Sequence, residues 1–169
     1  MSDLRVHKTK YINETKRVSF KYDGKNYFGY EGDTLASALL ANGVHLIGRS
    51  FKYHRPRGIM SCGSEEPNAI CQISDKNDLT EPNVRATELE IYDGLEAFSQ
   101  NCWPNVKFDI GGINNLISPL IPAGFYYKTF MWPKSFWKKV YEPLIRMSAG
   151  LGKSPTEPDP DIYLSLIHI

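Results

Sequence analysis

The stretch from Gly32 to Ile73, GDTLASALLANGVHLIGRSFKYHRPRGIMSCGSEEPNAICQI, decides the fold that we predict for this chain. It opens with the pattern of a short helix over residues 34–42. Asp33 or Thr34 can cap the N-terminal amides of this helix, and Gly43 can end it. Three leucines give the helix one apolar face: Leu35, Leu39 and Leu40. A cationic run and a polar, Gly-rich loop follow the helix, so the stretch predicts a packed helix followed by a charged, irregular segment.

Alternating apolar residues predict strands on both sides of this helix. Val18–Tyr22 and Asn26–Tyr30 form a predicted hairpin around the turn Asp23-Gly24. After the helix we expect strands at three places: Leu46–Ile47, Ala69–Ser74 and Thr87–Tyr92. The segment Asp75–Arg85 is predicted to be a polar loop. A hairpin, a helix and then further strands are the order of a β-grasp domain, and the predicted fold class is therefore α+β.

Composition indicates a globular protein of the cytoplasm. Of the 169 residues, 41% are hydrophobic and 23% are charged, close to the average of globular proteins. The net charge of +1 gives no field that would attract nucleic acid or a membrane surface. The N-terminus, MSDLRVHKTK, lacks the apolar region of a secretory signal, and no apolar run approaches the ~18 residues of a membrane span. Three widely spaced cysteines, Cys62, Cys71 and Cys102, are best interpreted as reduced thiols.

Several rare strings occur in one order along the chain. They are RSFKYHRPRG, GSEEPNA, YDGLEAFSQN (Tyr92–Asn101), PAGFYYKTFMWP (Pro122–Pro133), YEPLIRMSAGLG (Tyr141–Gly152) and PTEPDPD (Pro155–Asp161). On these strings, from about Val18 to Asp161, the chain resembles the N-terminal region of the alpha subunits of heterotetrameric sarcosine oxidases. The resemblance, together with the order of elements, implies a 2Fe-2S ferredoxin-like β-grasp domain over residues 17–93. Residues 1–16 are expected to be disordered or frayed.

The resemblance implies an oxidoreductase function for the intact protein. Sarcosine oxidases of this type demethylate N-methylglycine oxidatively, giving glycine, hydrogen peroxide and a one-carbon unit that passes to tetrahydrofolate. NAD, FAD and FMN are implied for the intact complex, with beta, gamma and delta subunits as partners. No GxSxG, HExxH or P-loop motif occurs, no catalytic residue or metal ligand is assigned, and the cofactor-binding residues stay unassigned. The chain alone is expected to be inactive.

Two other functions are open at this point. One is an electron-transfer [2Fe–2S] module of a related amine, opine or proline dehydrogenase. The other is a stand-alone binding module that is complete in this chain.

The Gly-rich loop lacks the ligands of a [2Fe–2S] cluster. A plant-type site takes four thiolates, three of them spaced C-x4-C-x2-C on one loop. Aligned on the string RPRG, cluster-bearing relatives place these three cysteines at the positions of Ser61, Glu66 and Ala69. Cys62 and Cys71 are displaced from these positions. We therefore expect no [2Fe–2S] cluster, and no zinc either, because the chain has no C-x2-C spacing.

The cationic run from Arg49 to Arg57 has three open roles. Its members are Arg49, Lys52, His54, Arg55 and Arg57. They can pair with carboxylates at an intersubunit or interdomain contact, or contact the phosphates of a dinucleotide, since guanidinium groups fork onto phosphate oxygens. The third role is a solvated loop. Two nearby glutamates and the near-neutral net charge argue against nucleic acid.

The chain changes character after residue 94. Residues 94–152 combine many aromatic residues with prolines, and we expect a docking segment with a helix near 134–147. The alternative is an ordinary aromatic core. Residues 153–163 are expected to form a Pro-rich tether to a missing dinucleotide-binding domain. Residues 164–169, LSLIHI, are what the end of a common transposase sequencing adapter encodes in one frame. We expect an adapter-derived tail on an N-terminal fragment, the alternative being a genuine C-terminal strand.

Overall fold

A computed structural model describes residues 4–5, 10–74, 80–120 and 132–144. The fold opens with two antiparallel strands, β1 (Asn13–Tyr22) and β2 (Lys25–Glu31). Asp23 and Gly24 make the turn between them with positive φ angles of 48° and 73°, as expected for an Asp-Gly hairpin turn. The predicted hairpin is present.

The helix α1 (Leu35–Ala41) follows, close to its predicted bounds. Thr34 is its N-cap, because the Thr34 hydroxyl accepts a hydrogen bond from the Ser37 amide at 3.2 Å. Gly43, with a φ of 74°, lies just after the C-cap, in the left-handed region that glycine adopts readily. Of the two predicted caps, the structure therefore selects Thr34.

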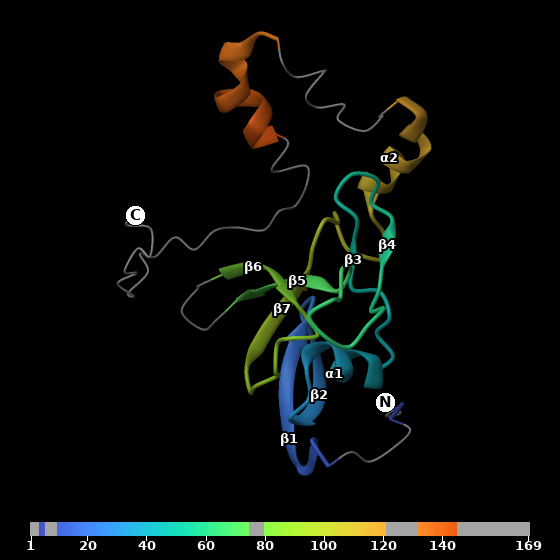
Figure 1. Cartoon of the computed structure of the whole chain (residues 1–169), viewed down its shortest axis with the longest axis vertical. Coiled ribbons are helices and arrows are strands. Elements are labelled where there is room, and N and C mark those ends of the chain that lie inside the picture. The colour runs from blue at the N-terminus through green and yellow to red at the C-terminus, as the bar shows by residue number, and fades with distance from the viewer. Residues whose placement is uncertain (1–3, 6–9, 75–79, 121–131, 145–169) are drawn as a thin grey trace, which may run out of the picture.

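The main sheet has five strands, of which three follow the helix. They are β5 (Ile70–Ser74), β6 (Thr80–Arg85) and β7 (Leu95–Ser99). The strand order is β2-β1-β7-β5-β6, and β1 pairs with β7 in parallel while the other neighbours are antiparallel (Figure 1). A separate two-stranded ribbon joins β3 (Gly48–Arg49) to β4 (Pro56–Arg57). The strand predicted at Leu46–Ile47 therefore lies two residues later in the chain. This mixed sheet with one packed helix is the predicted β-grasp.

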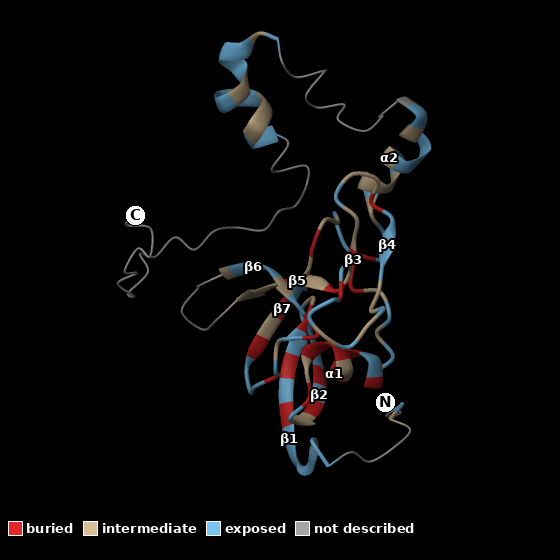
Figure 2. Cartoon of the chain, viewed as in Figure 1, coloured by how far each residue is buried: buried red, intermediate tan, exposed pale blue. Residues whose placement is uncertain are grey.

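The core lies between α1 and the sheet, where Figure 2 shows buried residues on α1, β1 and β2. On β1 every second residue near its end is buried, as expected for a strand with one covered face. The largest fully buried apolar side chains are Phe20, Leu35, Leu39, Ile47 and Leu95. Gly29 on β2 allows the close approach of α1, since a Cβ there would overlap the Ile91 side chain and lie 3.1 Å from the Ala38 Cβ.

The N-terminal segment is more ordered than predicted. β1 begins at Asn13, inside the segment 1–16 that was expected to be frayed. The Arg5 guanidinium forms an ion pair with the buried Asp33 carboxylate, and the Leu4 amide donates to the Ala41 carbonyl at 2.9 Å. These contacts hold residues 4–5 against the start and end of α1.

Three predictions about the later strands are wrong. The predicted loop Asp75–Arg85 contains β6, an edge strand in which Pro82 is tolerated because an edge needs fewer ladder hydrogen bonds. The predicted strand Thr87–Tyr92 instead starts with a turn in which the Leu89 amide donates to the Arg85 carbonyl, and it contributes an isolated bridge from Glu90 to Thr34. The sheet also extends past the predicted domain end at residue 93, because β7 is a central strand.

Short helical turns follow the sheet. They are η1 (Ile110–Gly112), α2 (Ile113–Leu116), η2 (Ser118–Leu120), η3 (Lys134–Phe136) and the π-helical turn η4 (Trp137–Tyr141). The last two lie where a helix near 134–147 was predicted. Residues 145–147, the predicted tether 153–163 and the predicted tail 164–169 lie outside the described residues. None of the helices in the described part of the chain is long and apolar enough to cross a membrane.

Candidate functional site

The loop from Met60 to Ala69, which we call the carboxylate loop, closes around the side chain of Glu66. The Glu66 Oε2 atom accepts hydrogen bonds from the Met60 and Ser61 amides, both at 2.6 Å, and from the Ser61 hydroxyl at 3.3 Å. The Oε1 atom accepts from the Asn68 amide at 2.7 Å and the Ala69 amide at 3.2 Å. Four backbone N–H groups therefore converge on one carboxylate.

Glu66 is buried as well as fully hydrogen-bonded. The residue is 1% exposed. Burial raises the pKa of the Glu66 carboxyl, but the four backbone N–H donors together outweigh that effect and hold the pKa below its ordinary value. The carboxylate is thus kept ionised, and its negative charge is stabilised by backbone dipoles rather than by a neighbouring cation.

The three predicted cluster positions lie on this loop. Two of them, Ser61 and Ala69, direct their amides to the carboxylate of the third, Glu66. A distant residue reaches the same loop, because the Thr87 hydroxyl donates to the Gly63 carbonyl at 2.8 Å. Thr87 is itself buried. Sequence reasoning missed Thr87, since its segment was predicted as a strand.

The donor set of this loop does not fit a [2Fe–2S] cluster. Hydroxyl, carboxylate and methyl groups stand where three thiolates are required. Among the described residues, no three or more His, Cys, Asp or Glu side chains are grouped so as to hold a metal ion.

The three cysteines lie in different environments. Cys62 is exposed on the carboxylate loop, Cys71 is buried on β5, and Cys102 follows β7. Burial raises the pKa of the Cys71 thiol to about 12. Burial also raises the pKa of the Cys102 thiol, although its 3.2 Å hydrogen bond with the Ser99 hydroxyl opposes this. Neither Cys71 nor Cys102 has the lowered pKa of a thiolate ligand or nucleophile.

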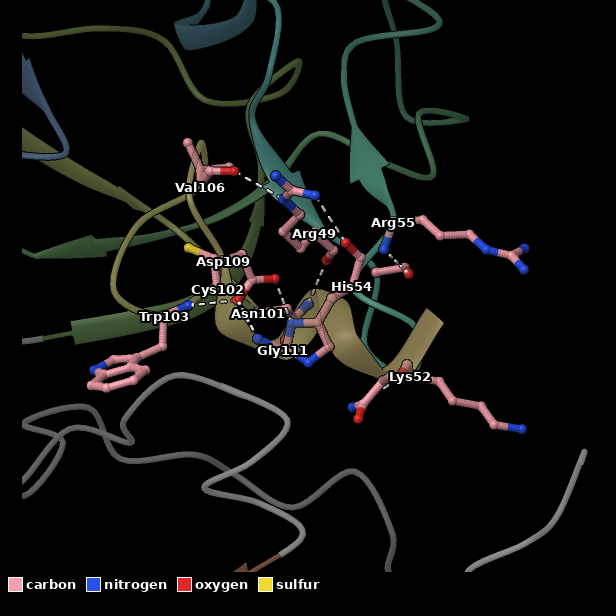
Figure 3. A network of polar contacts seen from close by, with 12 residues as sticks. Arg49, Lys52, His54, Arg55, Asn101, Cys102, Trp103, Val106, Asp109 and Gly111 are labelled. Carbon is pink, nitrogen blue, oxygen red and sulfur yellow. Dashed lines mark hydrogen bonds and ion pairs between the residues drawn. The ribbon is translucent and has the colours of Figure 1, made fainter. Parts of the chain in front are cut away.

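The cationic run contacts the segment after β7, and Figure 3 shows this network. The Arg49 guanidinium donates to the carbonyls of Val106 at 2.9 Å, His54 at 3.1 Å and Lys107 at 3.3 Å. The Asn101 side chain donates back to the Arg49 carbonyl at 3.1 Å. Arg49 therefore fastens the β3–β4 ribbon to the segment that follows the sheet, through carbonyl groups rather than carboxylates.

His54 makes the contact with a carboxylate in the same network. Its Nδ1 lies 2.7 Å from the Asp109 Oδ2, and both side chains are buried. The Asp109 Oδ1 accepts from the Trp103 amide at 3.0 Å and the Gly111 amide at 3.1 Å. His54 has a φ of 53°, uncommon for a residue with a side chain. His54 contacts a carboxylate, as one of the three predicted roles requires, whereas Arg49 donates to carbonyl groups. Both contacts join parts of this chain, so pairing at an intersubunit or interdomain contact stays a prediction.

The remaining cations of the run make more exposed contacts. Lys52 and Arg55 both stand over the Tyr53 ring, each 4.8 Å from its centroid. The Arg57 guanidinium donates to the Asn68 side chain at 3.0 Å and so joins β4 to the carboxylate loop. These contacts supply no group of cations that converges on one anion.

Comparison with known proteins agrees with the fold. The profile of the family described as "2Fe-2S iron-sulfur cluster binding domain" matches residues 15–102. The chain belongs to this family. The matched residues span β1 to β7, and the predicted ferredoxin-like β-grasp is confirmed.

The resemblance to sarcosine oxidase alpha subunits is also confirmed. The chain is 57% identical over 163 residues to sarcosine oxidase subunit alpha of Rhizobium meliloti (strain 1021), covering 96% of this chain and 16% of that relative. It is 41% identical over 88 residues to the subunit of the same name from Corynebacterium sp. (strain U-96), covering 51% of this chain and 9% of the relative. The chain therefore spans less than one fifth of the length of these curated relatives.

One solved structure shows a weaker similarity. The crystal structure of L-proline dehydrogenase from P. horikoshii is 26% identical, with a TM-score of 0.41, and the match covers 50% of this chain and 16% of that one.

Proposed function

We propose that this chain is the N-terminal part of the alpha subunit of a multi-subunit sarcosine oxidase, an oxidoreductase that acts on a CH–NH donor. The observation that carries the proposal is the 57% identity to a subunit of that name over 96% of the chain. The reaction is the oxidative demethylation of N-methylglycine to glycine, with release of hydrogen peroxide and transfer of the one-carbon unit to tetrahydrofolate.

Within this enzyme the chain has a structural rather than a catalytic role. The carboxylate loop offers no metal ligand set, and the contact between His54 and Asp109 holds two segments of the chain together. NAD, FAD and FMN belong to other parts of the complex, and the partners are the beta, gamma and delta subunits and the rest of the alpha subunit.

The exposed aromatic residues after β7 support a docking role for this part of the chain. Trp103 and Trp132 are 68% and 83% exposed. Large aromatic side chains are the groups that gain most from burial against a partner. The electron-transfer alternative is disfavoured by the donor set of the carboxylate loop, and the stand-alone module by these exposed rings.

A chimera tests the proposal. The matching residues of the R. meliloti alpha subunit are replaced by residues 1–163 of this chain and the subunit is co-expressed with its partners. We expect an assembled complex that forms hydrogen peroxide from N-methylglycine at a rate within about threefold of the parent, with dimethylglycine and proline as comparison substrates. A chimera that folds but does not assemble or oxidise N-methylglycine contradicts the proposal.

A further inference from the structure

The carboxylate loop has the residue spacing of an iron–sulfur loop, but the group at its centre is a carboxylate. Positions 61, 66 and 69 keep the C-x4-C-x2-C spacing with other residues. The amides of the first and last of these positions both donate to the side chain of the middle one, with further donation from Met60 and Asn68. The Glu66 carboxylate therefore lies at the centre of the loop and takes up its inward-facing N–H groups.

Electrostatics explains why a carboxylate suits this place. Successive backbone N–H groups that point into a concave loop form an anion-binding nest, and such nests surround many phosphate and iron–sulfur sites. A [2Fe–2S] group with four thiolate ligands carries net negative charge. If no anion were present, several of these inward-facing N–H groups would be buried without a hydrogen-bond acceptor. Each unsatisfied donor would lower the free energy of unfolding.

We propose that the Glu66 carboxylate is a built-in anion that takes the place of an iron–sulfur cluster in this domain. The carboxylate loop is an anion site occupied by a side chain of the same chain. The domain thereby keeps the loop shape of its family without iron, and it transfers no electrons.

A second segment, residues 86–87, contacts the carboxylate loop. The Ala86 amide donates to the Ala69 carbonyl at 2.8 Å, and the Thr87 hydroxyl donates to the Gly63 carbonyl at 2.8 Å. Among the described residues, Thr87 is the buried polar side chain that reaches the loop from a distant part of the sequence. The geometry therefore assigns to Thr87 the place of the fourth ligand, which plant-type sites take from a later segment.

The first test is chemical rescue of the emptied anion site in the 169-residue chain. Glu66→Ala leaves the amides and removes the anion, and we expect the Tm to fall by about 2–10 °C. Acetate or formate should then restore at least half of that loss in a saturable way. Wild-type protein and Glu66→Gln, which fills the space with an uncharged amide, are the controls and should show only a small, non-saturating change. Equal responses of all three proteins overturn the anion assignment.

The second test stands even if Glu66→Ala does not fold. The quadruple variant Ser61→Cys, Glu66→Cys, Ala69→Cys, Thr87→Cys is treated anaerobically with ferric iron and sulfide. We expect about two iron and two sulfide per chain and visible charge-transfer absorption. The triple variant that keeps Thr87 is the matched control and should bind less than half as much. Iron binding no higher than wild type overturns the cluster-site assignment, and equal binding by both variants overturns the role of Thr87.

Discussion

At the scale of single residues, two buried carboxylates, Glu66 and Asp33, are stabilised by different sets of donors. Glu66 is held by backbone N–H groups, whereas Asp33 is held by the Arg5 guanidinium, the Tyr30 amide and the Ser37 hydroxyl. A buried anion with a full set of donors is destabilised strongly when a donor or its own charge is removed. Both sites give clear mutational expectations.

The first prediction concerns pH. Because the folded pKa of Glu66 lies below its ordinary value, its contribution to stability is present above the unfolded pKa of about 4.3 and is lost as pH falls through the folded pKa. Glu66→Gln should lower the free energy of unfolding by about 1–3 kcal/mol at pH 7. That difference should shrink steadily below about pH 4.3. Urea denaturation of both proteins from pH 3 to 7 measures it, and a pH-independent difference would contradict the prediction.

The second prediction compares a buried ion pair with an exposed one. Arg5→Ala leaves the Asp33 carboxylate buried with fewer donors and should lower the free energy of unfolding by about 1.5–3 kcal/mol. Lys16→Ala breaks the exposed pair with Glu31 and should leave stability unchanged within error. Thermal denaturation of the two variants measures these changes in stability. If both variants melt like wild type, the contact between Arg5 and Asp33 does not stabilise the fold.

The spacing that identifies the carboxylate loop was readable from sequence, but its hydrogen bonding was not. Ser61, Glu66 and Ala69 follow from counting residues after RPRG. The direction of the Glu66 side chain depends on the conformation of the loop backbone. An irregular loop has no periodic pattern of apolar residues from which that direction could be predicted. Asp109 was missed for a related reason, since its partner His54 lies 55 residues earlier in the sequence.

At the scale of elements, the β3–β4 ribbon and the turn η1 are held together by close packing as well as hydrogen bonds. The Gly111 backbone packs so closely on the His54 ring that a Cβ there would overlap it. Gly112, its neighbour, has nothing within 4 Å of an added Cβ. The two glycines therefore provide a matched pair of variants.

Gly111→Ala should lower the free energy of unfolding by about 1–3 kcal/mol, because the His54 ring must shift and its contact with Asp109 weakens. Gly112→Ala should be neutral or stabilising by up to about 1 kcal/mol. Urea denaturation, with amide exchange of Gly111 as a local reporter, checks both. Equal effects at the two positions would show that this contact does not hold the segments together.

Elements were predictable where one face is regularly buried. β1 and α1 have clear periodicity, with Val18, Phe20 and Tyr22 alternating toward the core. β7 was missed because LEAFS is short and lacks β-branched residues, and its burial comes from its central place in the sheet. β6 was missed because its polar sequence and Pro82 resemble a loop.

At the scale of the whole molecule, the sheet depends on a strand that lies beyond the predicted domain end. β7 pairs with both β1 and β5, so its loss separates the sheet into two parts. A chain that ends at Asp93 should show no cooperative thermal transition by circular dichroism. A chain that ends at Pro119 keeps β7 and the Arg49 and His54 contacts, and it should melt within a few degrees of the 169-residue chain. A cooperative transition in the shorter chain would restore the boundary at residue 93.

The parallel pairing of β1 with β7 also sets an order of events during synthesis. β1 leaves the ribosome early, whereas Glu96, which pairs with Lys21, is 75 residues further along the chain. Such long-range pairing delays folding until the last partner is present. In a series of stalled ribosomes, protease resistance should therefore rise abruptly only once Ser99 has left the exit tunnel. The interval in which chaperones and proteases can act on the nascent domain thus ends with its last strand.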